Sequence, residues 1–383
     1  MSFLSRGSVV GPIAVSIAFV MELTLVPLLL PAIQRQFDLS VGELTWVFNS
    51  YGIAVALGVL LGGWLGDVFN SKKTFVVGVS LFASGAIIVA FAANYETIII
   101  GRILQGLGGG VFSPLIPLVL TQSVPHRPGK VLIVWGSVAG YVAASAPFFY
   151  GSFFSTYGWS LAFIVFAVVS VSGLAILNGS QIENNTLSPR IWSFKLTRLL
   201  RSRELAMMYG YILFTYGAIT YYAFRLPLWL EEKDFQLLSI GFILSILWLS
   251  FSVSSTLMRN WVDAPNIRGI LLTAPTLIAS GFALSYACND VTCLVLSSVL
   301  VGTGLACSNA PSTQLVLRFA PKGMSAISAS LDITFARIGG VVAVAVLAQS
   351  VYGYAVFAVT LMSFAAFLFA LQAVKGLEKR SEG

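Results

Sequence analysis

Charged residues, histidine and cysteine are all scarce in this sequence, and each shortage excludes a class of protein. Only 10% of the 383 residues are charged and 57% are hydrophobic, whereas a soluble domain has about 25% charged residues. The chain therefore cannot cover a water-facing surface, and a membrane protein is expected. The single histidine, His126, and the lack of any CxxC or Cys/His spacing argue against a metal site.

Signals of enzymatic chemistry are missing as well. The sequence has no G-x-x-x-x-G-K-[ST] phosphate loop and no residues for a histidine-based triad beyond His126. We therefore expect no enzymatic activity and no cofactor, and an ion gradient as the energy source. The net charge of +7 does not indicate nucleic-acid binding, because the basic residues lie at the ends of apolar runs and form no continuous basic face.

The three cysteines are Cys288, Cys293 and Cys307. Cys288 and Cys293 flank a short loop that the charge pattern places outside the cell. A disulfide between them and two unlinked thiols are both compatible with the sequence.

Long apolar runs dominate the rest of the chain. A helix needs about 20 apolar residues to cross the hydrocarbon layer, and the runs are continuous rather than alternating, which excludes strands. We therefore predict an all-α membrane protein with twelve transmembrane helices. The predicted spans are 9–31, 45–66, 74–93, 98–121, 131–154, 159–178, 206–229, 237–258, 268–287, 292–316, 325–349 and 352–374.

The connections between these spans differ in charge. If the N-terminus is cytoplasmic, the cytoplasmic side carries seventeen Lys and Arg residues, and the external side carries only Arg35 and Lys233. Because basic connections stay in the cytoplasm, we expect both termini inside the cell and the protein in the inner (plasma) membrane.

Two halves are indicated by the longest connection and by an internal repeat. Gly106-Leu-Gly108 in the fourth span recurs as Gly302-Thr-Gly304 in the tenth, 196 residues later, each with a proline soon after. Pro128-Gly129 recurs as Pro321-Lys-Gly323 at a similar offset. We predict two pseudo-symmetric six-helix bundles, an arrangement typical of transporters. They cover residues 1–178 and 206–383, joined by a cytoplasmic linker, 179–205, with an amphipathic piece around Ile191–Leu200.

The connection after the second span reads Gly62-Gly63-Trp-Leu-Gly66-Asp67-Val-Phe-Asn70-Ser71-Lys72-Lys73. It resembles the signature loop of the major facilitator superfamily, G-x-L-a-D-r-x-G-r-k/r. In that family the loop latches the two halves together. The resemblance implies a conformational latch made of Gly63, Asp67, Lys72 and Lys73. Asn70, Val68 and Ser71 depart from the usual Gly and basic residues.

Further motifs agree with this resemblance. Leu44-Thr-Trp46-Val-Phe-Asn49-Ser-Tyr51 is similar to the family's second-span opening, and Ser40-Val-Gly-Glu43 before it has capping-box spacing. Gly101-Arg102-Ile-Leu-Gln105-Gly106-Leu-Gly108 resembles the fourth-span R-x-x-Q-G-x-G. Tyr157-Gly158-Trp159 is similar to the sixth-span opening. Ala336-Arg337-Ile-Gly339-Gly340 resembles an element of the drug:proton antiporter families, especially the fourteen-span branch, although twelve spans are predicted here.

The fifth span resembles the antiporter motif G-x-x-x-G-P-x-x-G-G. Gly140, Pro147 and Gly151 carry the resemblance, while Ala146 and Tyr150 replace glycines. Small residues and a proline allow close packing and bending. Ordinary helix packing by small residues is the alternative.

Ionisable side chains inside the spans are the strongest functional signal, because each costs about 2.5–3.5 kcal/mol at a helix centre unless it is paired or hydrated. Glu22 occupies the acidic position of a first-span element that resembles L-D-x-T-i-v. We predict proton coupling by Glu22 and, second, by Asp332. Structural pairing of Glu22 with Arg102, or of Asp332 with Arg337 or a hydroxyl, is the alternative.

Other polar and aromatic residues lie on spans that line the central cavity in the resembled fold. Tyr209, Tyr216 and Phe224 lie close to helical spacing on the seventh span, where they suit either stacking on a ligand or interhelical packing. The candidate substrate-cavity residues are Arg102, Gln105, Tyr51, Trp135, Tyr209, Tyr216, Arg225, Trp248, Asn309 and Arg337.

The resulting functional prediction is a proton-coupled exporter of drugs or amphipathic metabolites that works by alternating access. Its partners are a small-molecule substrate, protons and the lipid bilayer, and a monomer is expected. Two alternatives stay open: an importer or uniporter of a small polar nutrient, and a non-transporting membrane receptor or scaffold.

Overall fold

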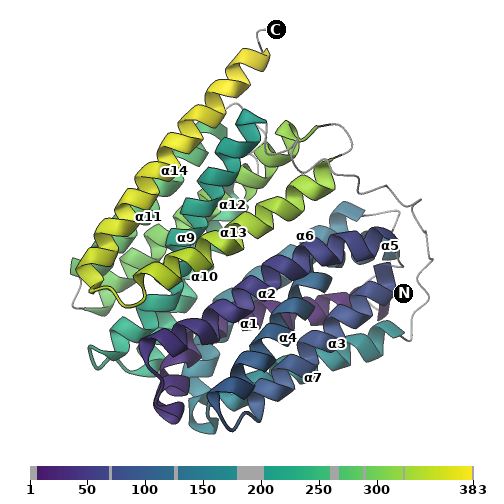
Figure 1. Cartoon of the computed structure of the whole chain (residues 1–383), viewed down its shortest axis with the longest axis vertical. Helices are drawn as coiled ribbons and strands as arrows, with labels where there is room; N and C mark the ends of the chain where they lie inside the picture. Colours follow the sequence, from purple (N-terminus) through teal and green to yellow (C-terminus); the bar gives the residue numbers. More distant parts are fainter. Residues whose placement is uncertain are drawn as a thin grey trace. The chain divides into compact units, whose positions relative to one another are not determined.

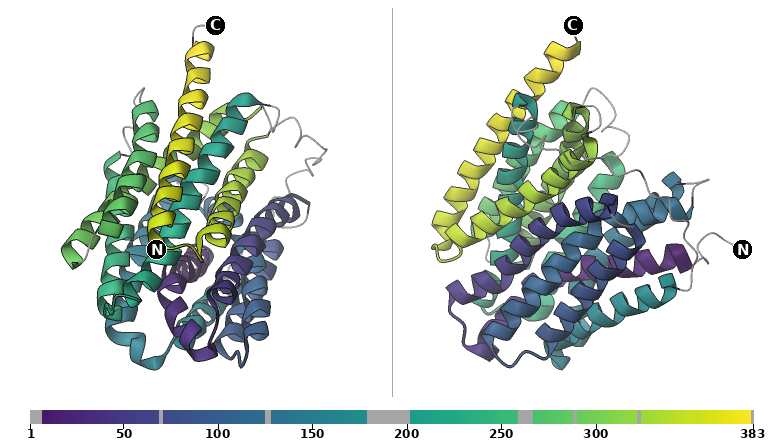
Figure 2. Two further views of the ribbon diagram at one scale, coloured as in Figure 1. Left: turned by 60° about the vertical axis from the view of Figure 1, so that its left-hand side comes forward. Right: turned by 45° about the vertical axis from the view of Figure 1, so that its right-hand side comes forward.

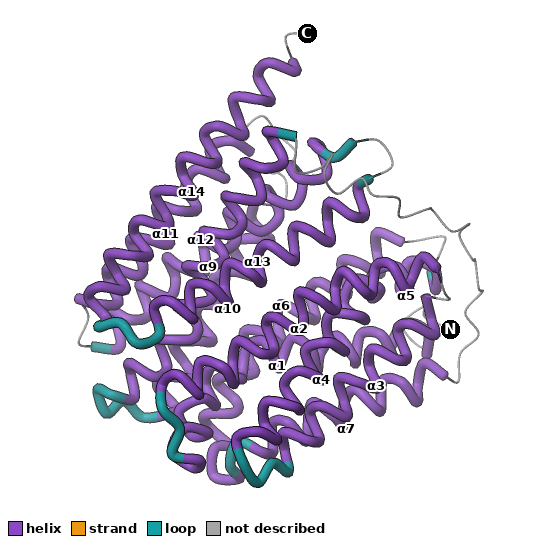
Figure 3. The backbone as a smooth tube through the Cα atoms, viewed as in Figure 1, coloured by secondary structure: helices purple, strands orange, loops and turns teal. Residues whose placement is uncertain are grey.

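A computed structural model describes residues 7–68, 71–124, 128–178, 202–258, 267–287, 290–321 and 324–381. These residues are almost entirely helical, and none of them forms a strand (Figure 3). The chain divides into two compact units, Met1–Trp192 and Ser193–Gly383. The predicted amphipathic piece at Ile191–Leu200 lies outside the described residues, as does most of the predicted linker.

Unit 1 holds the helices of the first six predicted spans (Figure 1). The fourth span is broken at a short 3-10 turn where Pro114 and Pro117 remove backbone donors. The fifth span ends in a π-helical turn three residues after Pro147. The elements are α1 (Gly7–Phe37), α2 (Val41–Val68), α3 (Ser71–Ala90), α4 (Tyr95–Phe112), η2 (Ser113–Leu115), α5 (Ile116–Ser123), α6 (Pro128–Phe149), η3 (Tyr150–Phe154), η4 (Ser155–Tyr157) and α7 (Ser160–Asn178).

Unit 2 holds six helices, which Figure 2 shows from two further sides. Its fourth helix stays α-helical through Pro311, unlike its broken counterpart in unit 1. The elements are α9 (Arg203–Glu231), α10 (Leu237–Met258), α11 (Ile267–Ala287), α12 (Val291–Phe319), α13 (Ser325–Leu347) and α14 (Tyr352–Ser381).

Length and composition suit these helices to a membrane. Within the described residues, eleven helical segments are long and apolar enough to cross one, with α4, η2 and α5 counted together. The remaining long helix, α9, corresponds to the seventh predicted span and has 29 residues. Its tyrosines and charged residues make it less apolar than the others. At about 1.5 Å per residue it is also long enough to span. The prediction of an all-α membrane protein is confirmed.

The same helix pairs pack together in the two units. In unit 1, α4 packs on α2 and α3, while α1 packs on α6 and α7 and α3 also contacts α7. In unit 2, α12 packs on α10 and α11, while α9 packs on α13 and α14 and α11 also contacts α14. Each pair of the first unit therefore has a counterpart in the second, which confirms the predicted repeat.

The register of the repeat is kept at individual contacts. A Cβ added to Gly106 would meet the carbonyl oxygen of Tyr51, and one added to Gly302 would meet that of Leu247. Both residues of the first contact are 196 positions before those of the second. The helix starts follow the same offset: Asn94 caps α4 by accepting from the Thr97 amide, and Asp290 caps α12 by accepting from the Cys293 amide.

Local signals read from the sequence shape two further helix starts. Ser40 and Glu43 form the predicted capping box, with the Ser40 amide donating to the Glu43 carboxylate at 2.9 Å and the Glu43 amide to Ser40 Oγ at 3.3 Å. Gly158 has a φ of 81°, a left-handed conformation that favours glycine, and the chain turns there into α7.

Candidate functional site

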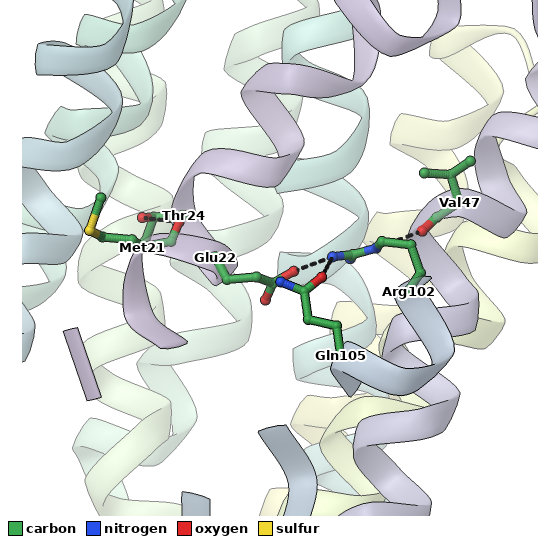
Figure 4. Close-up of polar contacts among 6 residues, drawn as sticks. All are labelled: Met21, Glu22, Thr24, Val47, Arg102 and Gln105. Carbon is green, nitrogen blue, oxygen red and sulfur yellow. Dashed lines mark hydrogen bonds and ion pairs between the residues drawn. The ribbon is translucent and has the colours of Figure 1, made fainter. Parts of the chain in front are cut away.

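A buried ion pair joins the first and fourth spans of unit 1 (Figure 4). Arg102 Nη1 on α4 donates to Glu22 Oε1 on α1 at 2.7 Å, and each side chain is 1% exposed. Burying two charges is tolerable only when they are paired with good geometry. The pair answers why a carboxylate lies in the middle of an apolar helix.

Further contacts with α2 and with its own helix fix the position of Arg102. Its Nε donates to the carbonyl oxygen of Val47 on α2 at 3.1 Å, and Nη1 also donates to Gln105 Oε1 at 2.8 Å. Its guanidinium carbon lies 4.2 Å from the centre of the Tyr51 ring, within the range of a cation–π interaction. Gln105 is one helical turn from Arg102, so the R-x-x-Q spacing places both on one face of α4. Arg102 thereby connects α1, α2 and α4.

Two polar atoms beside this pair have no hydrogen-bond partner within the described residues. They are Glu22 Oε2 and Gln105 Nε2, and both are buried. Glu22 therefore uses one carboxylate oxygen for Arg102 and keeps the other available. A proton can add to Oε2 without displacing an existing hydrogen-bond donor.

A second polar cluster lies in unit 2, on α9, α12 and α13. Thr313 donates its hydroxyl to Asp332 Oδ2 at 2.6 Å, and Tyr216 donates its hydroxyl to Asn309 Oδ1 at 2.8 Å. Asp332 is buried, Tyr216 is half-buried and Asn309 is exposed. The Asp332 contact is therefore with a hydroxyl rather than with Arg337.

Arg337 has no ion pair or hydrogen bond in the part of the chain that the structure describes. Its side chain is half-buried on α13. Asp332 lies five residues earlier on the same helix. Side chains three or four residues apart meet on a helix surface, and a spacing of five turns these two to different sides.

Arg225 is engaged nearer the end of α9. It forms an ion pair with Glu232, with 2.8 Å between Nη1 and Oε1. Nine residues separate Arg225 from Tyr216, about 13 Å along a helix. Arg225 is therefore placed outside the cluster around Asp332.

Most aromatic residues of α9 pack inside unit 2. Tyr209 stacks on Phe335 with 4.9 Å between ring centroids, and Tyr211, Tyr221, Tyr222 and Phe224 are fully buried. Tyr216 differs, because it is half-buried and bonds to an exposed residue. Of the predicted stripe, Tyr216 is the member that forms a hydrogen bond within the polar cluster.

The two candidate tryptophans have different surroundings. Trp135 on α6 donates its indole Nε1 to Ser16 Oγ on α1 at 2.7 Å. Trp248 on α10 is half-buried and packs edge-on against Phe251. The structure places neither beside Arg102 or Asp332.

The predicted latch lies at the junction of α2 and α3. Gly63 is half-buried in α2, and the close approach to α4 is made by the neighbouring Gly58 and Gly62. Lys72 and Lys73 lie in the first turn of α3, whereas the Asp67 side chain lies outside what the structure describes.

The antiporter motif follows the length of α6. Gly140 and Pro147 lie within the helix, and Gly151 is buried in the π-helical turn that follows. The motif therefore coincides with an irregular end of the fifth span.

One hydroxyl cluster was not predicted from the sequence. Tyr222 on α9 forms hydrogen bonds of 2.8 Å with Ser297 and 3.3 Å with Ser298 on α12. Ser298 lies 196 positions after Arg102, so the repeat supplies the signal that would have found it. Unit 2 thus has a neutral hydroxyl, Ser298, at the position where unit 1 has Arg102.

The two described cysteines differ in oxidation state. Cys293 is disulfide-bonded and Cys307 is a buried free thiol, while Cys288 lies outside the described residues. Among the described residues, no three His, Cys, Asp or Glu side chains are grouped to hold a metal ion.

Curated relatives are transport proteins. Over 208 residues the chain is 29% identical to the tetracenomycin C resistance and export protein of Streptomyces glaucescens, covering 52% of this chain and 38% of the relative. It is 22% identical over 346 residues to the riboflavin transporter RibZ of Clostridioides difficile, covering 76% of each. The first relatives are thus matched over about a quarter to two fifths of their length.

Solved structures share the fold at low sequence identity. A peptide transporter POT in complex with sulfate has a TM-score of 0.79 at 16% identity, covering 97% of this chain and 94% of that one. A D-xylose-proton symporter has a TM-score of 0.75 at 16% identity, covering 96% of each chain. A family model described as Major Facilitator Superfamily matches residues 13–344. The chain therefore belongs to the Major Facilitator Superfamily and is a multi-pass membrane protein.

Proposed function

We propose that the protein is a proton-coupled exporter that exchanges protons for drugs or other amphipathic solutes by alternating access. The observation that carries this proposal is the buried Glu22–Arg102 pair, in which Glu22 Oε2 has no hydrogen-bond partner among the described residues. A buried titratable group of this kind within a transporter is a functional candidate. The similarity to an export protein of Streptomyces glaucescens favours the outward direction.

Glu22 acts as the proton carrier in this mechanism. In its ionised form it neutralises Arg102 and ties α1 to α4. A proton on Oε2 removes the carboxylate charge and with it the ion pair. Arg102 then keeps its bonds to the Val47 carbonyl and to Gln105. Protonation thus loosens the α1 contact and leaves the α2 contact in place.

The conformational change follows from this local event. Two-state proteins shift when a ligand or proton binds one state better than the other. Loss of the pair changes the free energy of any state in which α1 and α4 lie together around it. Asp332, held by the Thr313 hydroxyl, is the second proposed titratable group. We place the protein in the plasma membrane with both termini in the cytoplasm.

The test uses inverted membrane vesicles with an imposed proton gradient and a fluorescent pH indicator. Ethidium and riboflavin serve as probes, added to wild type, Glu22→Gln and Glu96→Gln. Glu96 is an exposed carboxylate in the first turn of α4, so it is a matched control. We expect wild type and Glu96→Gln to release protons on adding at least one probe, and Glu22→Gln to lose at least tenfold in rate. Undiminished coupling in Glu22→Gln rejects the mechanism.

A nutrient importer is the second candidate, and one observation favours it. The match to a riboflavin transporter covers 76% of both chains, more than the match to the export protein. The two functions differ in direction. Uptake into inverted vesicles indicates export from the cell, and accumulation in right-side-out vesicles indicates import.

A further inference from the structure

The two units differ in how they handle the charges inside their helices. In unit 1, Glu22 and Arg102 neutralise each other at 2.7 Å. In unit 2, Asp332 and Arg337 carry opposite charges on one helix, and no ion pair involves either of them in the described part of the chain. An internal charge in a membrane protein needs a partner, water or a ligand. Asp332 and Arg337 are therefore available to interact with the charged groups of a ligand.

Helix geometry explains why Asp332 and Arg337 stay apart. Five residues correspond to about 7.5 Å along the axis and about 140° around it. The α13 backbone holds both side chains at this separation, since both lie well inside the helix Ser325–Leu347. Pairing within α13 is therefore disfavoured in any state that keeps the helix intact.

Both charged residues nevertheless lie close to the Tyr216 segment of α9, since Thr313, the partner of Asp332, is one helical turn after Asn309, the partner of Tyr216. The Tyr216 hydroxyl belongs to a stretch of α9 that packs on α13 close to Arg337, because a Cβ added to the adjacent Gly217 would meet the carbonyl oxygen of Gly339 at 2.9 Å. The same hydroxyl donates to Asn309, which is exposed on α12. The cluster thus has an accessible edge, a cation, an anion and two neutral hydrogen-bonding groups.

An apolar surface adjoins these polar groups. Phe335 is half-buried on α13 and stacks on Tyr209. The Tyr209 hydroxyl donates to the carbonyl oxygen of Ser328 at 3.4 Å, one helical turn before Asp332. The Tyr216 ring is half-buried as well. A ligand held between the charges can therefore place an aromatic or apolar body against these rings.

We propose that Arg337, Asp332, Tyr216 and Asn309 form a binding site for zwitterionic solutes with an apolar or aromatic body. Arg337 binds the anionic group and Asp332 the cationic or donor group, with Thr313 orienting the Asp332 carboxylate. Tyr216 and Asn309 supply hydrogen bonds between the two charged ends. This inference rests on the proposed transport function, because it names the class of solute that is moved.

The test compares three indoles that differ only in their charged head. Tryptophan is a zwitterion, tryptamine a cation and indolepropionate an anion. Binding to the full chain in neutral-lipid nanodiscs is measured by isothermal titration calorimetry, with empty nanodiscs as blank. The proteins are wild type, Arg337→Gln, Asp332→Asn and the control Arg318→Gln, whose exposed arginine lies in the last turn of α12.

The expected pattern follows from the charges. Wild type and Arg318→Gln bind tryptophan at least about tenfold more tightly than either singly charged probe, since each charged hydrogen bond contributes about tenfold or more. Arg337→Gln weakens tryptophan and indolepropionate and leaves tryptamine unchanged. Asp332→Asn weakens tryptophan and tryptamine and leaves indolepropionate unchanged.

Three results overturn the assignment: no binding of tryptophan, equal binding of all three probes, or the same loss for all probes in both variants. The measurement needs no proton gradient and leaves Glu22 intact. Charge-blind binding together with intact Glu22-dependent coupling therefore refutes this site alone. Zwitterion binding without proton release refutes the proposed function alone.

Discussion

Removing one member of the Glu22–Arg102 pair should destabilise the protein far more than removing both. Glu22→Leu leaves the Arg102 charge at 1% exposure without a carboxylate, and breaking a buried pair in this way costs about 3–5 kcal/mol. Glu22→Gln keeps a neutral acceptor beside Arg102, so we expect a smaller loss of about 1–2 kcal/mol. Glu22→Leu with Arg102→Met removes both charges and both desolvation costs.

A double-mutant cycle measures this difference. The free energy of unfolding is obtained by titrating micelles with SDS and following fluorescence, for which the chain has eight tryptophans. We expect the double variant to be more stable than Glu22→Leu alone, with a coupling energy of about 2–3 kcal/mol. If the two single losses are each below about 1 kcal/mol and add, the side chains are hydrated rather than paired, and the reasoning fails.

Three other predictions concern packing, hydrogen bonding and thiol chemistry. Gly106→Ala places a Cβ 2.6 Å from the Tyr51 carbonyl oxygen before any relaxation. It should lower the free energy of unfolding by about 1–3 kcal/mol in the same SDS titration. The control Gly136→Ala, with nothing within 4 Å of the added Cβ, should change it by less than about 0.5 kcal/mol. Trp135→Phe loses the bond to Ser16 and should cost about 0.5–1.5 kcal/mol, a loss that Ser16→Ala should not enlarge in the double variant. Alkylation of the denatured, unreduced chain should label one cysteine, Cys307, and alkylation after reduction should label all three. The number of labels is counted by intact mass. Three labels before reduction would contradict the disulfide and the external placement of the loop between Cys288 and Cys293.

The helices were predictable from the sequence because their signals are local. Apolar run length, the Ser40–Glu43 capping box and the Gly106/Gly302 repeat each depend on residues close together or on a simple offset. The break in the fourth span also had a local signal in Pro114 and Pro117. The single proline of the corresponding helix in unit 2, Pro311, lies within an unbroken α12.

The polar contacts were only partly predictable. Arg102 and Gln105 share a helix face through their spacing, and few internal carboxylates were available to pair with Arg102. Arg102 also donates to the backbone carbonyl oxygen of Val47 on α2, and no side-chain pattern in the sequence predicts this contact. The Thr313 partner of Asp332 was expected only as some hydroxyl, because the rotation of α12 against α13 is not encoded in spacing.

The offset of 196 residues between Arg102 and Ser298 has a consequence for how the two copies can change. Helix crossings in the second to fourth spans of each unit are superimposable in register, so these segments should be exchangeable as cassettes. In unit 1 this shared packing carries Arg102, which pairs with Glu22. In unit 2 the corresponding residue is Ser298, which forms a hydrogen bond with Tyr222. The two units therefore share their helix packing and differ in the side chains placed on it. A chimera that carries unit 1's cassette twice would have a second arginine, at the place of Ser298, without a carboxylate partner.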